Sequence, residues 1–482
     1  MRTRDRILAG VAVLGVGVAT AVACAPAAVP GPRVPVETRT GTLADGASWT
    51  VETPAGWNGT VLLYAHGAVL PGAPNPAVTA PDRFTGNVLL ERGYALAGSS
   101  YAGTGWAVEE ALDDQIAVLD VLPTPPREVL AWGSSLGGLV TAELVERHPD
   151  RIAGALPMCG VLAGGVPLWD RFQDVQSAIT TLLGPGPFLR VAGPMAAAGR
   201  LRAMLDTAQE TPQGRARIAL VAALGGLPGW AGAGTPRPSG PAGREVADYT
   251  TLRDQLVDLM VLGRAELVRR AGGNPSSTSG AARFRDAARQ DDVARLYAAA
   301  GLDLTADLAR LDNAPPVVAD PAARAYLARF STPTGDLHGR PVLTLHTTGD
   351  GLAVPSHESA YAAVVHDGDL AQAFVDRAGH CVFSTGELVA TVEELADRVH
   401  TGRSGPADAV ALAARARAER ARRRGRHAAG RARVRRGDTG EDLMLRAVRW
   451  LLQHLRTPSW PQSGPVVPAA TPGYPVARQG QP

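Results

Sequence analysis

A serine in a glycine-rich turn is the strongest chemical signal in this sequence. The string Gly-Ser-Ser-Leu-Gly-Gly at 133–138 comes directly after an apolar run, Glu128–Trp132, and directly before an amphipathic one, Leu136–His148. A serine hydroxyl becomes a strong nucleophile only when it is exposed, bonded to a base and backed by donors for the developing oxyanion. A sharp turn from strand to helix supplies the exposure, and small flanking residues relieve the crowding. The pattern therefore predicts a nucleophilic serine at its centre, Ser135.

Alternating strands and helices are expected to position this turn. Short apolar runs alternate with helix-like stretches on both sides of it, which predicts βαβ units and an α/β protein with a mostly parallel sheet flanked by helices. Residues 38–53 alternate like an antiparallel hairpin. The expected strands are Thr60–Ala65, Tyr94–Gly98, Glu128–Trp132, Ile152–Met158, Pro341–Thr347 and Ala371–Val375. The expected helices are Asp82–Arg92, Val108–Leu122, Leu136–His148, Ser356–Val365 and Glu387–Val399.

The middle third of the chain interrupts this alternation. Residues 161–336 are predicted to form a helical insertion in which Gly/Pro-rich loops separate the helices. The expected helices are Leu201–Ala208, Arg215–Leu224, Tyr249–Arg270, Ala281–Ala300 and Pro321–Ala328. Because strands are expected on both sides, the insertion is interpreted as a cap on a catalytic domain made of residues 38–160 and 337–401.

The strand, turn and helix around Ser135 resemble those of the α/β-hydrolase superfamily, over roughly residues 38–160 and 337–401. Members of that superfamily carry a serine, then an acid after a later strand, then a histidine in a loop after the last strand. Here Ser135 is followed by Leu-Thr-Leu-His-Thr-Thr-Gly-Asp at 343–350 and Phe-Val-Asp-Arg-Ala-Gly-His at 374–380. The resemblance implies the α/β-hydrolase fold, with the cap inserted after the strand that follows the nucleophile helix.

The resemblance also assigns roles to three side chains. Ser135 would attack an acyl carbonyl, His380 would remove its proton and return one to the leaving group, and Asp350 would orient the imidazole. Two alternatives stay open: Ser134 as the nucleophile, at a place where the superfamily tolerates any residue, and Asp376 as the acid, at the end of the strand that leads to the histidine. The other histidines fall in loops, strands, helices or the tail and are expected to have no catalytic role.

Further site residues follow from the same resemblance. Two backbone donors for the oxyanion are expected at Leu136, after the nucleophile, and at Ala68 in the loop after an early strand, with Gly67 as the alternative. Tyr101 and Trp106 follow another strand, and they either line the substrate pocket or belong to the core.

The amino terminus has the layout of a secretory signal peptide. Three arginines within the first six residues precede the apolar run Ile7–Ala23, so residues 1–23 are expected to direct export. The run is shorter than the roughly 20 residues of a membrane-spanning helix. Ala-Val-Ala-Cys at 21–24 is also similar to a lipobox, which would lipidate Cys24. In an oxidising exterior, Cys159 and Cys381 either pair or remain as buried free thiols.

The formal charge of +2 hides two oppositely charged regions. Residues 402–482 hold 16 Arg against five acids, a balance of +11, whereas residues 24–401 hold 29 Arg against 40 acids, a balance of −11. The Arg- and Pro-rich tail at 402–482 is expected to be largely disordered. It is either an arm attracted to anionic envelope polymers or lipid head groups, or an extension shaped by coding bias.

The predicted function is that of an exported bacterial serine hydrolase that cleaves carboxylic esters through an acyl-serine intermediate. A serine peptidase of prolyl-oligopeptidase-like or tripeptidyl aminopeptidase-like type is the first alternative, and a catalytically silent binding protein is the second. We expect a secreted or envelope-attached protein whose partner is a small ester or peptide, with membrane-surface association through Cys24 or the tail as a further option. The sequence has no Cys-x-x-Cys, His-Glu-x-x-His or phosphate-loop motif, so no metal or cofactor is expected. Nor is a nucleic-acid partner expected for an exported hydrolase whose tail has few aromatic residues.

Overall fold

The computed structural model describes residues 31–184, 193–287, 289–405 and 417. The expected signal segment, Cys24 and nearly all of the arginine-rich tail lie outside these ranges. Within them, we find no helix whose length and apolar character would let it cross a bilayer.

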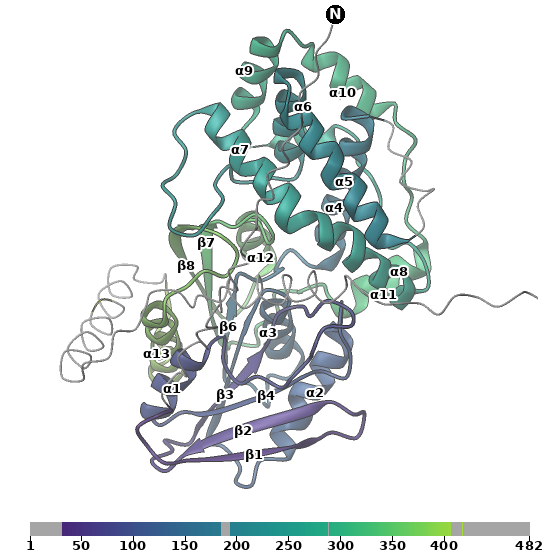
Figure 1. The fold of residues 1–482 in the computed structure, drawn as a ribbon. Coiled ribbons are helices and arrows are strands. Elements are labelled where there is room, and N and C mark those ends of the chain that lie inside the picture. Colours follow the sequence, from purple (N-terminus) through teal and green to yellow (C-terminus); the bar gives the residue numbers. More distant parts are fainter. Residues whose placement is uncertain (1–30, 185–192, 288, 406–416, 418–482) are drawn as a thin grey trace, which may run out of the picture.

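An eight-stranded sheet runs through the lower half of the molecule in the order β1-β2-β4-β3-β5-β6-β7-β8 (Figure 1). β1 and β2 form the expected antiparallel hairpin, β2 pairs antiparallel with β4, and the strands from β3 to β8 run parallel. The strands are β1 (Val36–Thr42), β2 (Ser48–Pro54), β3 (Thr60–Ala65), β4 (Ala95–Ser99), β5 (Glu128–Ser134), β6 (Gly154–Met158), β7 (Pro341–Gly349) and β8 (Asp369–Ala378). The prediction of a mostly parallel α/β sheet is confirmed.

Helices cover both faces of this sheet. On one face lie α1 (Arg83–Glu91) and α13 (Thr385–Thr401), and on the other lie α2 (Val108–Asp120), α3 (Leu136–Arg147) and α12 (Ser356–Val364) (Figure 1). Since both faces are covered, β3 and β4 are buried along their whole length and carry almost only apolar side chains. This burial gives the parallel strands a rigid common edge on which loops can be held.

The chain between β6 and β7 forms a helical cap, which lies above the edge where these strands end (Figure 1). Its helices are α4 (Gly165–Leu182), α5 (Pro194–Gln209), α6 (Pro212–Leu224), α7 (Pro241–Thr251), α8 (Arg264–Ala271), α9 (Gln290–Ala300), α10 (Leu304–Asp312) and α11 (Pro321–Phe330). The sequence analysis missed α4 and α10.

Two of the predicted cap helices are interrupted in the structure. The one expected at Tyr249–Arg270 passes from α7 to α8 through two π-helical turns, Leu252–Leu256 and Leu259–Gly263. The one expected at Ala281–Ala300 starts as a 3₁₀ turn, Ala282–Asp286, and continues only later as α9. Apolar periodicity indicates which face of a segment is buried, but it does not reveal such changes of winding.

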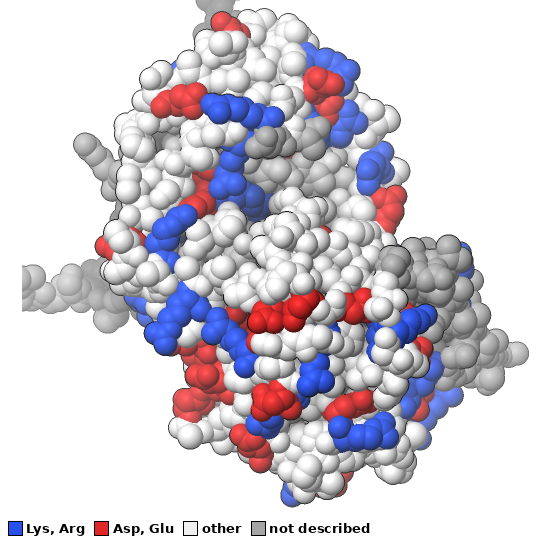
Figure 2. All heavy atoms as spheres, turned by 180° about the vertical axis from the view of Figure 1, so that it is seen from behind, with Lys and Arg blue, Asp and Glu red and all other residues white. Residues whose placement is uncertain are grey.

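Ion pairs between arginine and aspartate connect the cap helices. Arg244 on α7 binds both carboxylate oxygens of Asp292 on α9, at 2.5 and 2.7 Å, and Arg217 on α6 binds Asp307 on α10 at 2.7 Å. Figure 2 shows acidic and basic side chains interleaved over one face of the molecule. Many of the arginines in the body of the protein are therefore used to hold helices together.

Candidate active site

The predicted nucleophile turn is a tight junction between β5 and α3. Ser135 has φ 60° and ψ −120°, a left-handed backbone conformation that costs a non-glycine residue about 1–3 kcal/mol. Its N–H donates to the carbonyl oxygen of Met158 at 2.9 Å. A Cβ atom on Gly133 or Gly137 would overlap the carbonyl oxygen of Ala65, which explains why only glycine fits beside the serine. The strain is maintained by the packing of β3, β5 and β6.

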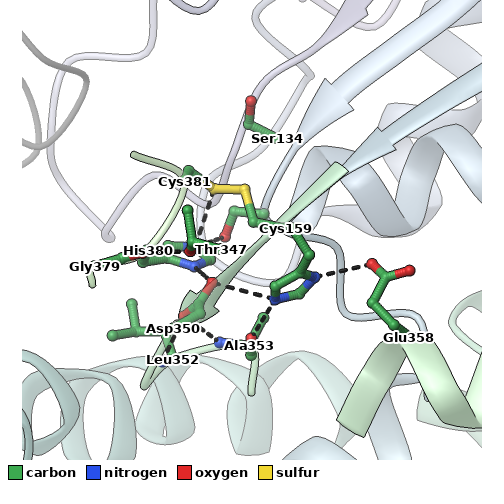
Figure 3. Close-up of a disulfide and its surroundings, with 12 residues drawn as sticks. Ser134, Cys159, Thr347, Asp350, Leu352, Ala353, Glu358, Gly379, His380 and Cys381 are labelled. Atoms are coloured by element: carbon green, nitrogen blue, oxygen red, sulfur yellow. Dashed lines mark hydrogen bonds and ion pairs between the residues drawn. A yellow bond between two sulfur atoms is a disulfide. The ribbon is translucent and has the colours of Figure 1, made fainter. Parts of the chain in front are cut away.

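A serine, a histidine and a carboxylate form a hydrogen-bonded row at the edge of the sheet. Oγ of Ser135 lies 2.7 Å from Nε2 of His380. On the other side of the ring, Nδ1 of His380 lies 2.7 Å from Oδ2 of Asp350, and Figure 3 shows these two side chains next to each other. Ser135 is half-buried, the side chain of His380 is 8% exposed and Asp350 is fully buried. This arrangement can take a proton from the serine hydroxyl and stabilise the resulting imidazolium.

The carboxylate of Asp350 is held by donors on both oxygens. Oδ1 accepts the N–H groups of Leu352 and Ala353, at 2.8 and 3.2 Å, while Oδ2 faces His380. Burial raises the pKa of Asp350, but the neighbouring charge of His380 and hydrogen bonds from His346 and His380 outweigh it and lower the pKa to about 2. Asp350 is therefore ionised at neutral pH.

The loops that carry the acid and the base are fastened together. Thr347 Oγ1 donates to the carbonyl oxygen of Gly379 at 2.6 Å, and the Gly379 N–H donates to Gly349 at 3.0 Å. A disulfide joins Cys159, directly after β6, to Cys381, the residue after His380, with the Cα atoms 5.4 Å apart (Figure 3). The position of His380 is thus fixed from two sides.

The two alternatives of the sequence analysis lie apart from this row. Ser134 points away from His380 in Figure 3, and its Oγ accepts a hydrogen bond from Tyr64 at 3.2 Å. Asp376 is exposed on β8, where it accepts hydrogen bonds from Thr348 and Arg237, each at 2.7 Å. The structure thus brings Ser135, Asp350 and His380 together, and Ser134 and Asp376 do not contact His380.

The predicted oxyanion donors lie at the start of α3 and in the loop after β3. In the described part of the chain no hydrogen bond uses the N–H of Leu136 or of Ala68, which leaves both free to donate. A Cβ atom on Gly67 would lie 3.3 Å from Cβ of Ser135, so this loop passes directly over the serine. The positive end of the α3 helix dipole would also stabilise an oxyanion formed at Ser135.

Tyr101 and Trp106, the two predicted pocket residues, are both buried. The Tyr101 ring stacks on His66 with centroids 3.9 Å apart, and its hydroxyl donates to the His66 carbonyl at 3.0 Å, which supports the loop over the serine. Trp106 packs edge-on against Trp169 of α4, at 5.6 Å between ring centroids. Tyr101 thus supports the loop over Ser135, and Trp106 of the sheet domain packs against the cap.

Sequence reasoning missed a buried pair behind the acid. His346 on β7 and Glu358 on α12 are at most 1% exposed, and Nδ1 of His346 lies 2.9 Å from Oε1 of Glu358. Nε2 of His346 lies 3.5 Å from Oδ2 of Asp350. No known motif links a histidine to a glutamate twelve residues later; only the packing of α12 on β7 brings them together.

Two groups of side chains bring metal-ligand atoms close together in the described ranges. Cys159, His380 and Cys381 lie within 4.8 Å of one another, but both sulfurs are used by the disulfide. The second group is Asp336, His366 and Asp367, where the Asp367 carboxylate already caps the N–H of Leu337. A cavity of about 270 Å³ lies within the cap, between α4, α10 and residues 278–280, and none of the triad residues lines it.

Comparison with known proteins gives one curated relative. The chain is 27% identical over 424 residues to an o-phthalyl amidase from Xanthobacter agilis, a match that covers 75% of this chain and 87% of the relative. No family model matches the chain.

Solved structures of hydrolases also resemble the chain. A proline iminopeptidase from Mycobacterium smegmatis is 16% identical with a TM-score of 0.34, covering 80% of this chain and all of that one. Feruloyl esterase B from Aspergillus oryzae is 12% identical with a TM-score of 0.39, covering 77% and 82%. These scores are too low to carry an argument, so the assignment rests on the strand order and the strained serine between β5 and α3. By these features the chain has the α/β-hydrolase fold.

Proposed function

We propose that this protein is an exported serine hydrolase that cleaves carboxylic esters through an acyl intermediate on Ser135. The observation that carries the proposal is the continuous row from Ser135 through His380 to Asp350, with 2.7 Å at each step. Such a row lets the serine lose its proton as it attacks, and the histidine then protonates the leaving group.

The reaction has two halves that use the same groups. In the first, Ser135 Oγ forms a bond to the acyl carbon, His380 takes the serine proton, and the N–H groups of Leu136 and Ala68 bind the oxyanion. The carbon–oxygen bond to the leaving alcohol then breaks, and the alcohol takes the proton from His380. In the second, water attacks the acyl-serine with His380 as the base, and the acid product leaves.

Amide hydrolysis is the second candidate, because the curated relative is named an amidase. The same row of residues supports attack on an amide, provided that His380 protonates the departing amine. Amides of aromatic acids, phthalyl amides among them, are therefore the first amide substrates to test.

Export is part of the proposal. The disulfide between Cys159 and Cys381 supports it, since disulfides persist in oxidising compartments and are rare in the cytosol. The apolar run at 7–23 supports it independently.

A substrate panel tests the proposal. The chain from residue 24 onward would be offered p-nitrophenyl esters of rising acyl length, benzoyl and phthalyl anilides, and aminoacyl and prolyl anilides. We expect ester turnover that disappears in Ser135→Ala and survives in Ser134→Ala, its matched control. Cleavage of aminoacyl or prolyl anilides without any ester turnover would overturn the ester assignment in favour of a peptidase, and no turnover with any substrate would leave a silent binding protein.

A further inference from the structure

The polar network below the triad continues beyond Asp350. Both ring nitrogens of His346 face oxygen atoms: Nδ1 faces Oε1 of Glu358 at 2.9 Å, and Nε2 faces the carbonyl oxygen of Ala353 at 2.8 Å and Oδ2 of Asp350 at 3.5 Å. Polar contacts thus connect the half-buried Ser135 to a buried glutamate behind the sheet edge, and the 3.5 Å ion pair between His346 and Asp350 is the longest of these contacts. Figure 3 shows Glu358 and Asp350 on either side of this connection.

The hydrogen bonds determine where the protons lie. A backbone carbonyl can only accept, so Nε2 of His346 must carry a proton toward Ala353. The other oxygen of Glu358, Oε2, accepts from the Thr344 hydroxyl and from Nε2 of Gln372, and two donors favour the ionised carboxylate. An ionised Glu358 then requires a proton on Nδ1 as well.

We infer that His346 is a positioning residue: a protonated imidazole that shares Oδ2 of Asp350 with His380 and has Glu358 as its counter-charge. The inference rests on the proposed function, because Asp350 matters here as the acid of that triad. With its two loop N–H donors on Oδ1 and the two imidazoles on Oδ2, the Asp350 carboxylate cannot rotate away from His380. Glu358 cancels the charge of His346, so Asp350 keeps its full negative charge for the imidazolium that forms on His380.

The charged surroundings are consistent with this assignment. Burial lowers the pKa of His346, but hydrogen bonds and charge interactions with Asp350 and Glu358 more than compensate and raise it to about 10. Asp350 and Glu358 face the His346 ring directly, and His357 interacts with it electrostatically. His380 and Arg171 of α4 interact with Asp350. His357 accepts the N–H of Ala163 at 3.0 Å on Nδ1, and its pKa is lowered to about 3 by burial and nearby cations, so it is neutral.

The test is the pH dependence of kcat/KM for an ester, whose acidic limb reports deprotonation of His380. Glu358→Gln removes a negative charge and should move this limb down by on the order of one pH unit. His346→Gln removes a positive charge and should move it up by a similar amount, and the double variant should return toward the parent value. His357→Gln, which removes a neutral ring next to Glu358, is the matched control and should leave the limb in place.

If His346 had only a structural role, Glu358→Gln and His346→Gln would both lower activity, but they would not shift the acidic limb of the pH profile in opposite directions. That result would overturn the inference. A second measurement on the unaltered chain does not need folded variants. In ¹⁵N-histidine NMR spectra, the ring of His346 should carry protons on both nitrogens from about pH 6 to about pH 9; a neutral ring would contradict the inference. The spectrum does not depend on turnover. If the protein had no esterase activity, the proposed function would be wrong, but the spectrum would still show whether His346 is protonated.

Discussion

Two buried carboxylates at the sheet edge differ from one buried glutamate in the cap. At the edge, Asp350 and Glu358 each accept hydrogen bonds on both oxygens. In the cap, Glu245 on α7 is 1% exposed, and its Oε2 has one long contact of 3.4 Å from Gln209. Its Oε1 has no hydrogen-bond partner among the residues that the structure describes. The two edge carboxylates are thus held as charges by several donors, whereas Glu245 is buried with almost none.

The difference also appears in the backbone. Tyr101, Ser135, Cys159 and Cys381 all adopt positive φ, and all of them lie at the ends of strands or in the loops around the triad. In the cap the departures from ideal geometry are two π-helical turns and the loops between helices. Strain is therefore concentrated where a reacting atom must be presented, and we expect substitutions at the edge to affect catalysis as well as stability and those in the cap to affect mainly stability.

The largest effect is expected at the acid. Asp350→Asn should lower kcat/KM for an ester by on the order of 10⁴-fold, because an amide in that place leaves His380 in the wrong tautomer. Steady-state kinetics on the folded variant measures this loss. Asp376→Asn is the control, since its carboxylate pairs with an exposed arginine, and it should act like the parent. Equal losses in the two variants would break the distinction between the buried and the exposed acid.

The disulfide comes next. Replacing both Cys159 and Cys381 by serine should lower the free energy of unfolding by about 2–5 kcal/mol, since the bond closes a loop of 222 residues in the unfolded chain. Urea unfolding measures this quantity. Ester turnover should fall as well, because only the hydrogen bonds at Gly379 would then hold the His380 loop in place. Unfolding curves that coincide for parent and variant would mean that the bond contributes nothing to the edge.

The two buried glutamates give a paired prediction with opposite signs. Burial raises the pKa of Glu245 to about 7, while the unfolded chain ionises near 4.5, so the folded state loses stability as the pH rises between these values. Glu245→Gln should therefore stabilise the protein at pH 8 by on the order of 1–3 kcal/mol and have little effect at pH 4. Glu358→Gln should destabilise it at pH 8, because His346 loses its counter-charge. Urea titrations at pH 4 and pH 8 measure the free energy of unfolding of both variants. Stabilisation by both at pH 8 would contradict the difference between Glu245 and Glu358.

The smallest effect is expected at the cap surface. Arg253 pairs with Asp206 between α5 and the first π-helical turn, and both side chains are about one-third or more exposed, at 36% and 41%. Arg253→Ala should change the free energy of unfolding by less than about 1 kcal/mol. Arg244→Ala, which strips a two-point pair from the buried Asp292, should cost more in the same urea titration. A larger loss at Arg253 than at Arg244 would contradict this ranking.

The sheet edge could be predicted from the sequence better than the cap. The strands around the triad are continuous apolar runs bounded by turn residues, so their order and the positions of Ser135, Asp350 and His380 could be predicted. In the cap, α4 begins with Gly-Val-Pro, which is typical of a turn. The N-terminus of α10 did carry a readable signal, because Asp303 caps the N–H groups of Thr305 and Ala306.

The pair of His346 and Glu358 could not be predicted at all. It depends on how α12 packs against β7, and neither residue belongs to a motif. The places of Tyr101 and Trp106 depend likewise on tertiary neighbours, His66 in one case and Trp169 in the other. Sequence patterns indicate which residues reach the edge of the sheet, but not what each side chain touches there.

Covalent labelling is the most direct test of whether Ser135 is the nucleophile. The chain would be treated with a fluorophosphonate probe and the labelled peptide mapped by mass spectrometry, alongside Ser135→Ala and the matched Ser134→Ala. We expect one label on Ser135 in the parent chain, full labelling of Ser134→Ala and none of Ser135→Ala. Undiminished labelling of Ser135→Ala would contradict this expectation.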